Sequence, residues 1–490
     1  MSTSDAVPDW VADAIFYQIF PDRFARSRLA ASELEFEDWD SPPTREGFKG
    51  GDLRGITEHL SDLTDLGVNA IYLNPIFSSA SNHRYHAYDY FEVDPLLGGN
   101  TAFRDFLNRA QQRGLRVILD GVFNHCGRGF WPFHHLLECG EASPYRDWFT
   151  VKSWPLQAYE GEPNYEAWWQ LPALPKFNVA NPDTREYLLR VAEHWVREGA
   201  DGWRLDVPQE IRDETFWDQF RARVKAIRPD AYLVGEVWDE APDWVGHRFD
   251  GLMNYPLTRL AAGFCAEKIA ADCTPGDRTI VPFDGPAALR ELTRLLVAYP
   301  DGNTRSMLKL LSSHDTPRFV TQVSGDSSGF ALATLLQMTL PGAPCVYYGD
   351  EIGLSGGGDP DCRAAFPWDR SRWDRNTYDF TRRAIALRTS EPALRRGAFE
   401  PGLASSKFFS YSMAGDDGRI EVFLNAGSTV RRVPVRGVDA IVAAAEELWA
   451  PELPAPRKAP ADFGSGEWPW SLDLPARSAR VLKFPVAPSA

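Results

Sequence analysis

Short apolar segments alternate with amphipathic helical segments along most of this chain, and this alternation restricts the fold more than any other feature. Eight segments have the length and composition of buried strands: residues 14–20, 69–75, 115–123, 201–207, 231–237, 250–256, 306–313 and 343–351. Strands that alternate with helices at this spacing predict a parallel sheet, because parallel neighbours need a crossover connection. Eight such units predict an α/β fold, a (β/α)8 TIM barrel.

Two stretches do not follow the alternation. About 60 residues rich in Trp, Pro, Phe and His separate the third strand from the next helical segment, and a loop of that length is usually functional. After about residue 395 the pattern changes to period-two runs such as KFFSYSMA and RIEVFLNA, which predict antiparallel strands. We expect a first part of the barrel (1–124), an excursion inserted after strand 3 (125–180), a second part of the barrel (181–393) and a C-terminal antiparallel β-sandwich (394–490).

Charge and cysteine usage narrow the possible partners and compartment. The net charge of -16 argues against nucleic acid and against an anionic membrane as partners. The first residues have no basic stretch followed by an apolar one, and no apolar run approaches the length of a membrane span. The cysteines lack CxxC and metal-site spacing, which indicates structural thiols: Cys126, Cys139, Cys265, Cys273, Cys345 and Cys362. We therefore predict a cytoplasmic protein.

The fourth predicted strand carries two opposite charges. In GWRLDVPQE (202–210), Arg204 and Asp206 stand two residues apart, and residues two apart point to the same face of a strand. A charge-assisted hydrogen bond from Arg204 would lower the pKa of Asp206 and keep it ionised, as a nucleophile requires. Glu236 ends the next strand among apolar residues, which would raise its pKa and suit a general acid.

Further polar side chains follow other strands at the same end. Asp120, Asn124 and His125 follow the third strand, and His314 and Asp315 follow the seventh. Taken singly, such groups are more simply explained as structural ion pairs or solvated loop residues. Because chemistry in a (β/α)8 barrel occurs at the carboxyl ends of the strands, their coincidence there favours one site. Two carboxyl groups on adjacent strands fit a retaining glycosidase, in which they lie roughly 5–5.5 Å apart.

The same segments resemble a known family. DGVFNH (120–125), GWRLDVPQE (202–210), GEVW (235–238) and LSSHDTPR (311–318) are similar to the four signature segments of the α-amylase family, glycoside hydrolase family 13. LPKFN (174–178), FDGLMNYP (249–256) and PGAPCVYYGDE (341–351) are also family-like. The resemblance covers roughly residues 14 to 390 and implies the barrel, the inserted domain and the C-terminal sandwich expected above.

The resemblance implies roles for individual residues. Asp206 would be the nucleophile, Glu236 the general acid/base and Asp315 the stabiliser of the transition state. Further residues would bind the substrate around them: Arg204 as the partner of Asp206, His125 and His314 at the sugar before the cut, and Asp120.

One loop allows two alignments with the family. SNHRYHAYDY (81–90) is similar to the loop that supplies a histidine and a stacking tyrosine to that sugar. The resemblance implies His83 and Tyr85, or His86 and Tyr88 in a shifted register.

Among subgroups, the chain is most similar to cyclomaltodextrinases, neopullulanases and maltodextrin glucosidases. Glu210 matches the end of the nucleophile segment in that group, and Trp238 either stacks on the leaving-group sugar or packs at the top of the barrel. The sequence lacks the N-terminal β-domain that this group usually carries, so the resemblance implies no particular oligomeric state. Asn124 matches a calcium ligand of α-amylases, but an Asn/Asp-rich calcium loop is missing after the first strand, and we expect no metal and no cofactor.

We therefore expect a retaining α-glucan hydrolase that cleaves α-1,4 linkages of short maltooligosaccharides or cyclodextrins through a covalent glycosyl-enzyme intermediate, with transglycosylation. The alternative is a disaccharide isomerase or glucosyltransferase of the trehalose- or isomaltulose-forming type, which shares the chemistry up to that intermediate. A non-catalytic relative is a third interpretation, which the presence of all three carboxylates and of Arg204 disfavours.

Overall fold

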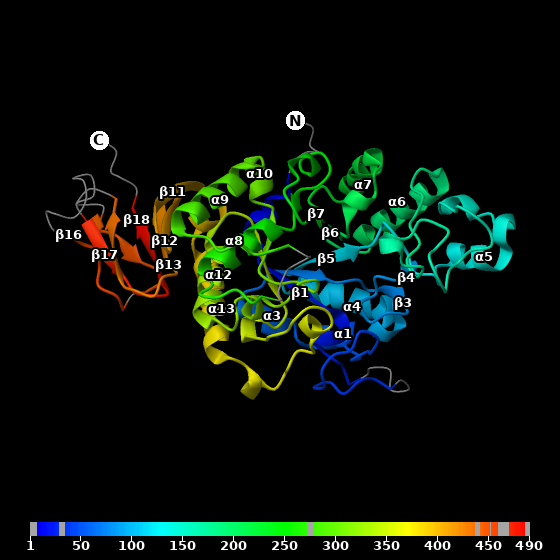
Figure 1. Cartoon of the computed structure of the whole chain (residues 1–490), viewed down its shortest axis with the longest axis horizontal. Coiled ribbons are helices and arrows are strands. Elements are labelled where there is room, and N and C mark those ends of the chain that lie inside the picture. The colour runs from blue at the N-terminus through cyan, green and yellow to red at the C-terminus, as the bar shows by residue number, and fades with distance from the viewer. Residues whose placement is uncertain are drawn as a thin grey trace.

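A closed barrel of parallel strands forms the centre of the molecule (Figure 1), in a computed structural model that describes residues 7–28, 35–271, 278–436, 442–450, 452–458 and 470–485. Its strands are β1 (Phe16–Ile19), β2 (Ala70–Leu73), β5 (Arg116–Gly121), β6 (Gly202–Leu205), β7 (Tyr232–Gly235), β8 (Gly251–Leu252), β9 (Leu308–Leu310) and β10 (Ala343–Tyr347). They pair in the order β8-β7-β6-β5-β2-β1-β10-β9, and a parallel bridge between Met253 and Leu308 closes the ring. The predicted eight strands and the TIM barrel are confirmed.

Helices follow most strands and cover the outside of the barrel. They are α1 (Pro21–Phe24), α2 (Leu53–Glu58), α3 (Leu60–Leu66), α4 (Gly99–Gln112), α6 (Pro182–Arg197), α7 (Glu214–Ile227), α8 (Tyr255–Cys265), α9 (Gly285–Val297), α10 (Asp301–Thr304), α11 (Phe319–Gln322), α12 (Ser327–Thr339), α13 (Arg375–Ser390) and α14 (Pro392–Arg396). Local sequence sets where they begin: Asn181 caps α6 by accepting from the N–H groups of Asp183 and Thr184. In the described ranges, none of these helices is both long enough and apolar enough to cross a bilayer.

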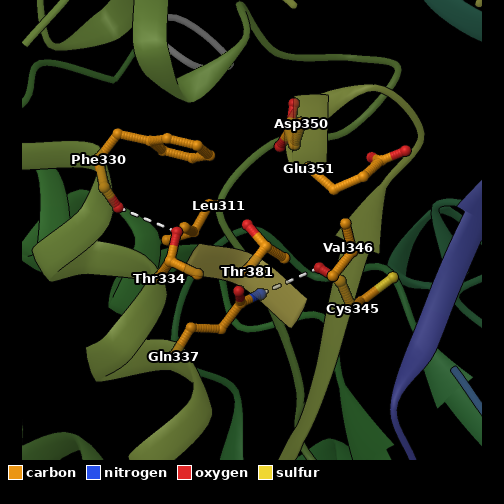
Figure 2. A pocket seen from close by; sticks show the side chains of 9 residues that line it. All are labelled: Leu311, Phe330, Thr334, Gln337, Cys345, Val346, Asp350, Glu351 and Thr381. Atoms are coloured by element: carbon orange, nitrogen blue, oxygen red, sulfur yellow. Dashed lines mark hydrogen bonds between the residues drawn. The ribbon is translucent and has the colours of Figure 1, made fainter. Parts of the chain in front are cut away.

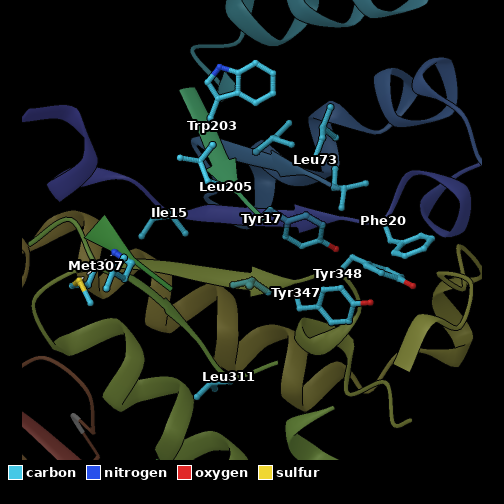
Figure 3. Packing of buried hydrophobic residues seen from close by; sticks show 14 of the residues in the cluster. Ile15, Tyr17, Phe20, Leu73, Trp203, Leu205, Met307, Leu311, Tyr347 and Tyr348 are labelled. Atoms are coloured by element: carbon cyan, nitrogen blue, oxygen red, sulfur yellow. Dashed lines mark hydrogen bonds between the residues drawn. The ribbon is translucent and has the colours of Figure 1, made fainter. Parts of the chain in front are cut away.

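Side chains of the barrel strands alternate between two apolar clusters. Tyr17, Leu73, Trp203 and Leu205 belong to the large cluster between the strands and the helices (Figure 3). The intervening residues fill the barrel interior: Phe16, Ala70, Tyr72, Ile118, Tyr232, Val234, Met253, Leu308, Leu310 and Ala343. This period of two decides which polar residues point into the barrel.

Between β5 and α6 the chain leaves the barrel, as expected from the sequence. This excursion contains α5 (Trp131–Cys139) and lies beside the hairpin of β3 (Phe77–Ser79) and β4 (Ala87–Val93), at the end of the molecule opposite the C-terminal strands (Figure 1). Isolated antiparallel bridges, including His125 with Lys176 and Phe149 with Phe177, hold the excursion together. The limits 125–180 stay a prediction.

The C-terminal strands form two antiparallel sheets. One has the order β11-β12-β13-β18-β15 and the other β14-β17-β16. The strands are β11 (Ala398–Ser405), β12 (Phe408–Gly415), β13 (Gly418–Asn425), β14 (Arg431–Val435), β15 (Glu446–Glu447), β16 (Arg457–Lys458), β17 (Trp470–Leu474) and β18 (Ser478–Phe484). Phe408, Phe423, Val433 and Leu472 pack in a shared cluster, which confirms a C-terminal antiparallel β-structure. Residues 437–441, 451, 459–469 and 486–490 of the predicted sandwich lie outside the described residues.

The described cysteines carry free thiols. Cys126, Cys265, Cys345 and Cys362 are buried, and Cys139 is exposed. Cys273 lies outside the described residues.

Candidate active site

The predicted site residues meet at the carboxyl ends of the strands. Asp120 and Arg204 are register partners on β5 and β6, and both occupy inward positions of the barrel. Asp206 follows β6 and Glu236 follows β7, which pairs with β6. Asp315 comes after β9 but still lies in reach of these groups, since the charge of Arg204 acts on its carboxyl group. Segments that are far apart in the sequence thus meet at one rim of the barrel.

Arg204 is the centre of the cluster and is fully buried. Its Nη1 donates to Asp120 Oδ1 at 2.8 Å and to Asp206 Oδ1 at 2.9 Å. Its Nη2 lies 3.0 Å from Glu236 Oε2. One guanidinium therefore contacts three carboxyl groups, and its single positive charge is shared among them.

Arg204 lowers the pKa of Asp206 as predicted, but its effect does not set the net direction, which is opposite to the prediction. Burial raises the pKa of Asp206 well above its usual range; Arg204 opposes this rise, while the charges of Glu236, Asp120 and Asp315 add to it. The sequence shows only the pair, whereas the structure makes Arg204 a partner of several acids in a site with little water. The cluster as a whole consequently retains protons at a pH where isolated carboxylates have lost them.

Glu236 has the raised pKa that its apolar neighbours predicted. Burial raises the pKa of Glu236 from 4.5 to about 7, against the attraction of Arg204. Both carboxyl oxygens accept a hydrogen bond, Oε2 from the Val207 N–H at 3.0 Å and Oε1 from the Trp238 Nε1–H at 3.2 Å. Val207 has a φ of 35°, a conformation that β-branched residues rarely adopt, and in it the N–H reaches Glu236.

His314 is a neutral hydrogen-bond donor to Asp315. The amide nitrogens of Gln18 and Asn74 face His314 Nδ1 at 2.9 and 3.2 Å, so Nδ1 accepts and Nε2 carries the hydrogen. Burial lowers the pKa of His314 well below its usual range. His314 Nε2 lies 3.0 Å from Asp315 Oδ2, and Arg363 Nη2 donates to Asp315 Oδ1 at 3.4 Å.

Asp315 differs from the other two acids in its exposure. Its side chain is 30% exposed, whereas those of Asp206 and Glu236 are 10% and 4% exposed. Burial still raises the pKa of Asp315, with Arg363 and Arg204 opposing. Its position at the open side of the cluster suits contact with ligand hydroxyl groups.

The loop with two possible alignments places Tyr85 in the site. Tyr85 donates its hydroxyl to Asp120 Oδ2 at 2.7 Å, and its ring is parallel to His314 with a centroid distance of 5.4 Å. His83 supports this tyrosine, because its Nδ1 accepts from the Tyr85 N–H at 3.1 Å. The ring of Tyr88 instead lies against Gly127, and the His86 ring packs on His83. The geometry therefore favours the alignment with His83 and Tyr85.

One ring nitrogen of His125 is available to a ligand. Its Nε2 is buried and makes no hydrogen bond within the described part of the chain, although the Tyr85 carbonyl faces the ring. Burial lowers the pKa of His125 to about 3, so the ring is neutral near pH 7. Asn124 Nδ2 lies 3.2 Å from its Nδ1, which leaves Nε2 as the nitrogen available to a ligand.

Two predicted substrate-binding residues have other protein partners. Trp238 stacks on Tyr255 with a centroid distance of 3.9 Å while it donates to Glu236, so it both packs at the barrel top and contacts the acid. Glu210 pairs with Lys176 at 3.1 Å and thus connects the end of β6 to the LPKFN segment of the excursion.

Sequence reasoning missed several residues of the site. Gln18 and Asn74 face His314, Tyr72 donates to Asp120 at 2.7 Å, and Arg363 contacts Asp315. Gln18 and Asn74 stand at the carboxyl ends of the first two strands, so their position at a strand end is the signal in the sequence that identifies them. In the sequence Tyr72 looks like an ordinary strand residue, and only the alternation of side chains along the strand identifies it as one that points into the barrel.

Among the residues that the structure describes, no group of three or more His, Cys, Asp or Glu side chains is arranged to hold a metal ion. Asn124, which resembles a calcium ligand, directs its Nδ2 to His125.

A small cavity between α12 and β10 is separate from the site (Figure 2). Its volume of about 10 Å³ holds roughly one water molecule. Burial raises the pKa of Glu351 in its lining to about 7, and both oxygens of Glu351 already accept, from the Tyr17 hydroxyl at 2.7 Å and the Gly349 N–H at 2.8 Å. No predicted site residue lines this cavity.

Two buried carboxyl groups share an arginine at the strand ends of a (β/α)8 barrel, and one of them has a pKa near 7, which is the arrangement that a glycoside hydrolase requires. Comparison with known proteins identifies the family of glycoside hydrolase, because residues 18–391 match the catalytic domain of α-amylase. The chain belongs to the α-amylase family, glycoside hydrolase family 13.

Individual relatives cover most of the chain. The cyclomaltodextrinase of Geobacillus thermopakistaniensis (strain MAS1) is 42% identical over 433 residues, which cover 87% of this chain and 71% of the relative. The structure of Ttha1563 from Thermus thermophilus has a TM-score of 0.91 at 45% identity and covers 97% of this chain and 99% of its own. The debranching enzyme of Nostoc punctiforme has a TM-score of 0.86 at 41% identity, with 98% and 99% covered.

Proposed function

We propose that this chain hydrolyses α-1,4 linkages of short maltooligosaccharides or cyclodextrins with retention of configuration. The observation that carries the mechanism is the shared contact of Asp206 and Glu236 with Arg204, at 2.9 and 3.0 Å. A common guanidinium keeps the two carboxyl groups close, which suits the roughly 5–5.5 Å spacing of retaining enzymes rather than the roughly 6.5–9.5 Å of inverting ones. The similarity to a cyclomaltodextrinase supports the substrate class.

In the first step, protonated Glu236 donates its proton to the glycosidic oxygen while Asp206 attacks the anomeric carbon. The C–O bond to the leaving sugar breaks, and a glycosyl ester forms on Asp206. In the second step, ionised Glu236 takes a proton from water, whose oxygen attacks the same carbon and releases Asp206. A sugar hydroxyl in place of water gives transglycosylation. The hydrogen bond from Arg204 Nη1 favours the ionised form of Asp206 within the cluster.

The remaining residues bind the sugar at which this exchange occurs. Asp315 accepts from its hydroxyl groups, and His125 donates to them through its unpartnered Nε2. His314 Nε2 faces Asp315 and orients that carboxyl group, and the Tyr85 ring offers an apolar face. Because both histidines are neutral near pH 7, they donate hydrogen bonds without adding charge to the site.

The test is a proton NMR time course on maltotriose with wild type and with Glu236→Gln as the blank. The α-anomer is expected to appear first, with longer oligosaccharides as evidence of transfer, and Glu236→Gln is expected to be silent. Glu291→Gln is the matched control, since it makes the same chemical change at a carboxylate on α9 that is paired with Arg294 and lies outside the site. First appearance of the β-anomer would refute retention. Intact maltotriose together with conversion of maltose or sucrose would favour disaccharide isomerisation or glucosyl transfer.

The similarity to the Nostoc punctiforme debranching enzyme supports α-1,6 linkages as a second candidate substrate class. Panose, which contains one α-1,4 and one α-1,6 linkage, distinguishes the two. Release of maltose and glucose from its α-1,6 bond would favour debranching, whereas release of isomaltose would favour α-1,4 hydrolysis.

We also propose a cytoplasmic location. The buried free thiols of Cys126, Cys265, Cys345 and Cys362 suit a reducing compartment. Cell fractionation with antibody detection tests this, and recovery of the protein in the medium would contradict it.

A further inference from the structure

The excursion exposes a tryptophan on an unusual backbone. Trp169 is 76% exposed, and both Trp169 and Gln170 have a positive φ, of 50° and 58°. Residues with a β-carbon rarely adopt this region, so the conformation costs free energy and persists only where the surrounding structure fixes it. Burial of Trp169 cannot be what offsets this cost, because most of its surface is in water.

The surrounding structure holds this loop firmly at its base. Ala167 and Pro175 form an antiparallel bridge, and the Trp168 N–H donates to the Leu174 carbonyl at 2.9 Å. The Pro175 carbonyl in turn accepts from the Cys126 N–H at 3.1 Å, in the segment that follows β5. The loop is therefore anchored to the same chain segment that carries His125.

Three rings run in parallel from the site toward solvent. The planes of His125 and Trp168 differ by 1°, with a centroid distance of 6.0 Å. Trp168 and Trp169 differ by 19°, at 5.1 Å. His125 is 2% exposed and Trp169 is 76% exposed, so the row connects the buried rim with the surface.

Other exposed aromatic residues of the excursion lack this connection. Trp131 is 61% exposed and meets His135 edge to face, at an interplanar angle of 78°. Tyr159 is 71% exposed and lies under the Arg128 guanidinium. Isolated exposed aromatics are common on protein surfaces and need no function. The aligned pair next to the site is a different case.

We propose that Trp169, supported from behind by the parallel ring of Trp168, forms a platform on which the α-glucan stacks a glucose unit that lies beyond those joined by the cleaved bond. Glucose has an apolar C–H face and a polar edge, and a rigid tryptophan ring offers a flat apolar surface of matching size at a small cost in side-chain entropy. The pair thereby sets the preference for chain length. This inference deepens the proposed function and rests on it.

The test compares kcat/KM for maltohexaose with kcat/KM for maltotriose in wild type, Trp169→Ala and Trp168→Ala. We expect the ratio of the two values to fall about tenfold in Trp169→Ala, which corresponds to ~1.4 kcal/mol of binding. The change should lie mainly in KM, since stacking away from the cleaved bond contributes equally to ground state and transition state. Trp131→Ala is the matched control, and its ratio should equal that of wild type.

Binding gives a second readout that does not need turnover. In a Glu236→Gln background, calorimetric titration with maltohexaose should show a Kd about tenfold higher when Trp169→Ala is added. An unchanged ratio and an unchanged Kd in Trp169→Ala would overturn the platform. If wild type still hydrolyses maltotriose in that case, the proposed function stands. A wild type that cleaves no α-glucan would overturn the proposed function itself. A ratio that falls as much in Trp131→Ala would show that general loosening of the excursion, rather than stacking, is the cause, and would also overturn the platform.

Discussion

Replacement of Glu236 by glutamine should stabilise the protein at alkaline pH while it abolishes activity. Glu236 is 3% exposed, and burial raises its pKa from 4.5 to about 7. A carboxyl group whose folded-state pKa is raised contributes full stability below its unfolded pKa and loses that contribution as the pH rises through the folded value. Wild type therefore loses stability between about pH 4.5 and pH 7, whereas a glutamine does not titrate.

The size of the effect follows from the same pKa. At ~1.36 kcal/mol for each pH unit, the rise from 4.5 to about 7 corresponds to ~3.4 kcal/mol. This is a sizeable part of the ~5–15 kcal/mol by which domains are stable. Glutamine keeps an oxygen that accepts from the Val207 N–H or the Trp238 Nε1–H, so the variant retains part of the existing hydrogen bonding.

Urea denaturation followed by tryptophan fluorescence between pH 4.5 and pH 8.5 measures the effect. The free energies of unfolding of wild type and Glu236→Gln should approach each other at the acid end and diverge by ~3 kcal/mol above pH 7. Glu210→Gln, at a carboxylate on the surface paired with Lys176, should show no comparable gain at high pH. A Glu236→Gln protein that is less stable than wild type at pH 8 would refute the reasoning.

Four other perturbations test the rest of the structure. The pH profile of kcat/KM should fall above about pH 7, because Glu236 must be protonated to donate; a rate still rising at pH 9 would contradict this role. Arg204→Met should lower kcat/KM by at least ~10³-fold and destabilise the protein by ~3–5 kcal/mol at pH 7 in urea denaturation, since it leaves several buried acids without their shared cation. Arg388→Met should cost at least ~3 kcal/mol in the same assay, because fully buried Arg388 donates to the carbonyls of Met338, Leu340, Leu394 and Gly342. Incubation with EDTA should leave the rate of maltotriose hydrolysis unchanged, and a loss restored by calcium would contradict the expectation of a metal-free site.

The fold could be predicted because its signal is repeated many times. Each barrel strand is a short apolar run, and each is long enough only for a buried strand. The apolar segment 250–256 predicts the place of β8 but not its length, since the strand itself spans only Gly251–Leu252. A single segment of this kind carries little information, but eight in regular spacing allow few architectures.

The membership of the site could be predicted better than its electrostatics. Charged residues at strand ends are visible in the sequence, and so is their common rim. The pKa of Asp206 depends on how many acids share Arg204 and on how little water reaches them, and neither is encoded in the local pattern. In the same way, Trp238 and Glu210 lie where the sequence suggested, but their partners Tyr255 and Lys176 come from other parts of the chain.

The alternation that builds the barrel also builds the site. On β5, Ile118 belongs to the interior cluster and Asp120 is the next inward position; on β1, Phe16 and Gln18 have the same relation. The interior therefore changes from apolar to polar within one two-residue step near the carboxyl ends of these strands. A shift of β6 by one residue would turn Arg204 toward the helices and bring Leu205 inward. Since a buried arginine among the helices would lack its acids, the register that is stable is also the register that assembles the site.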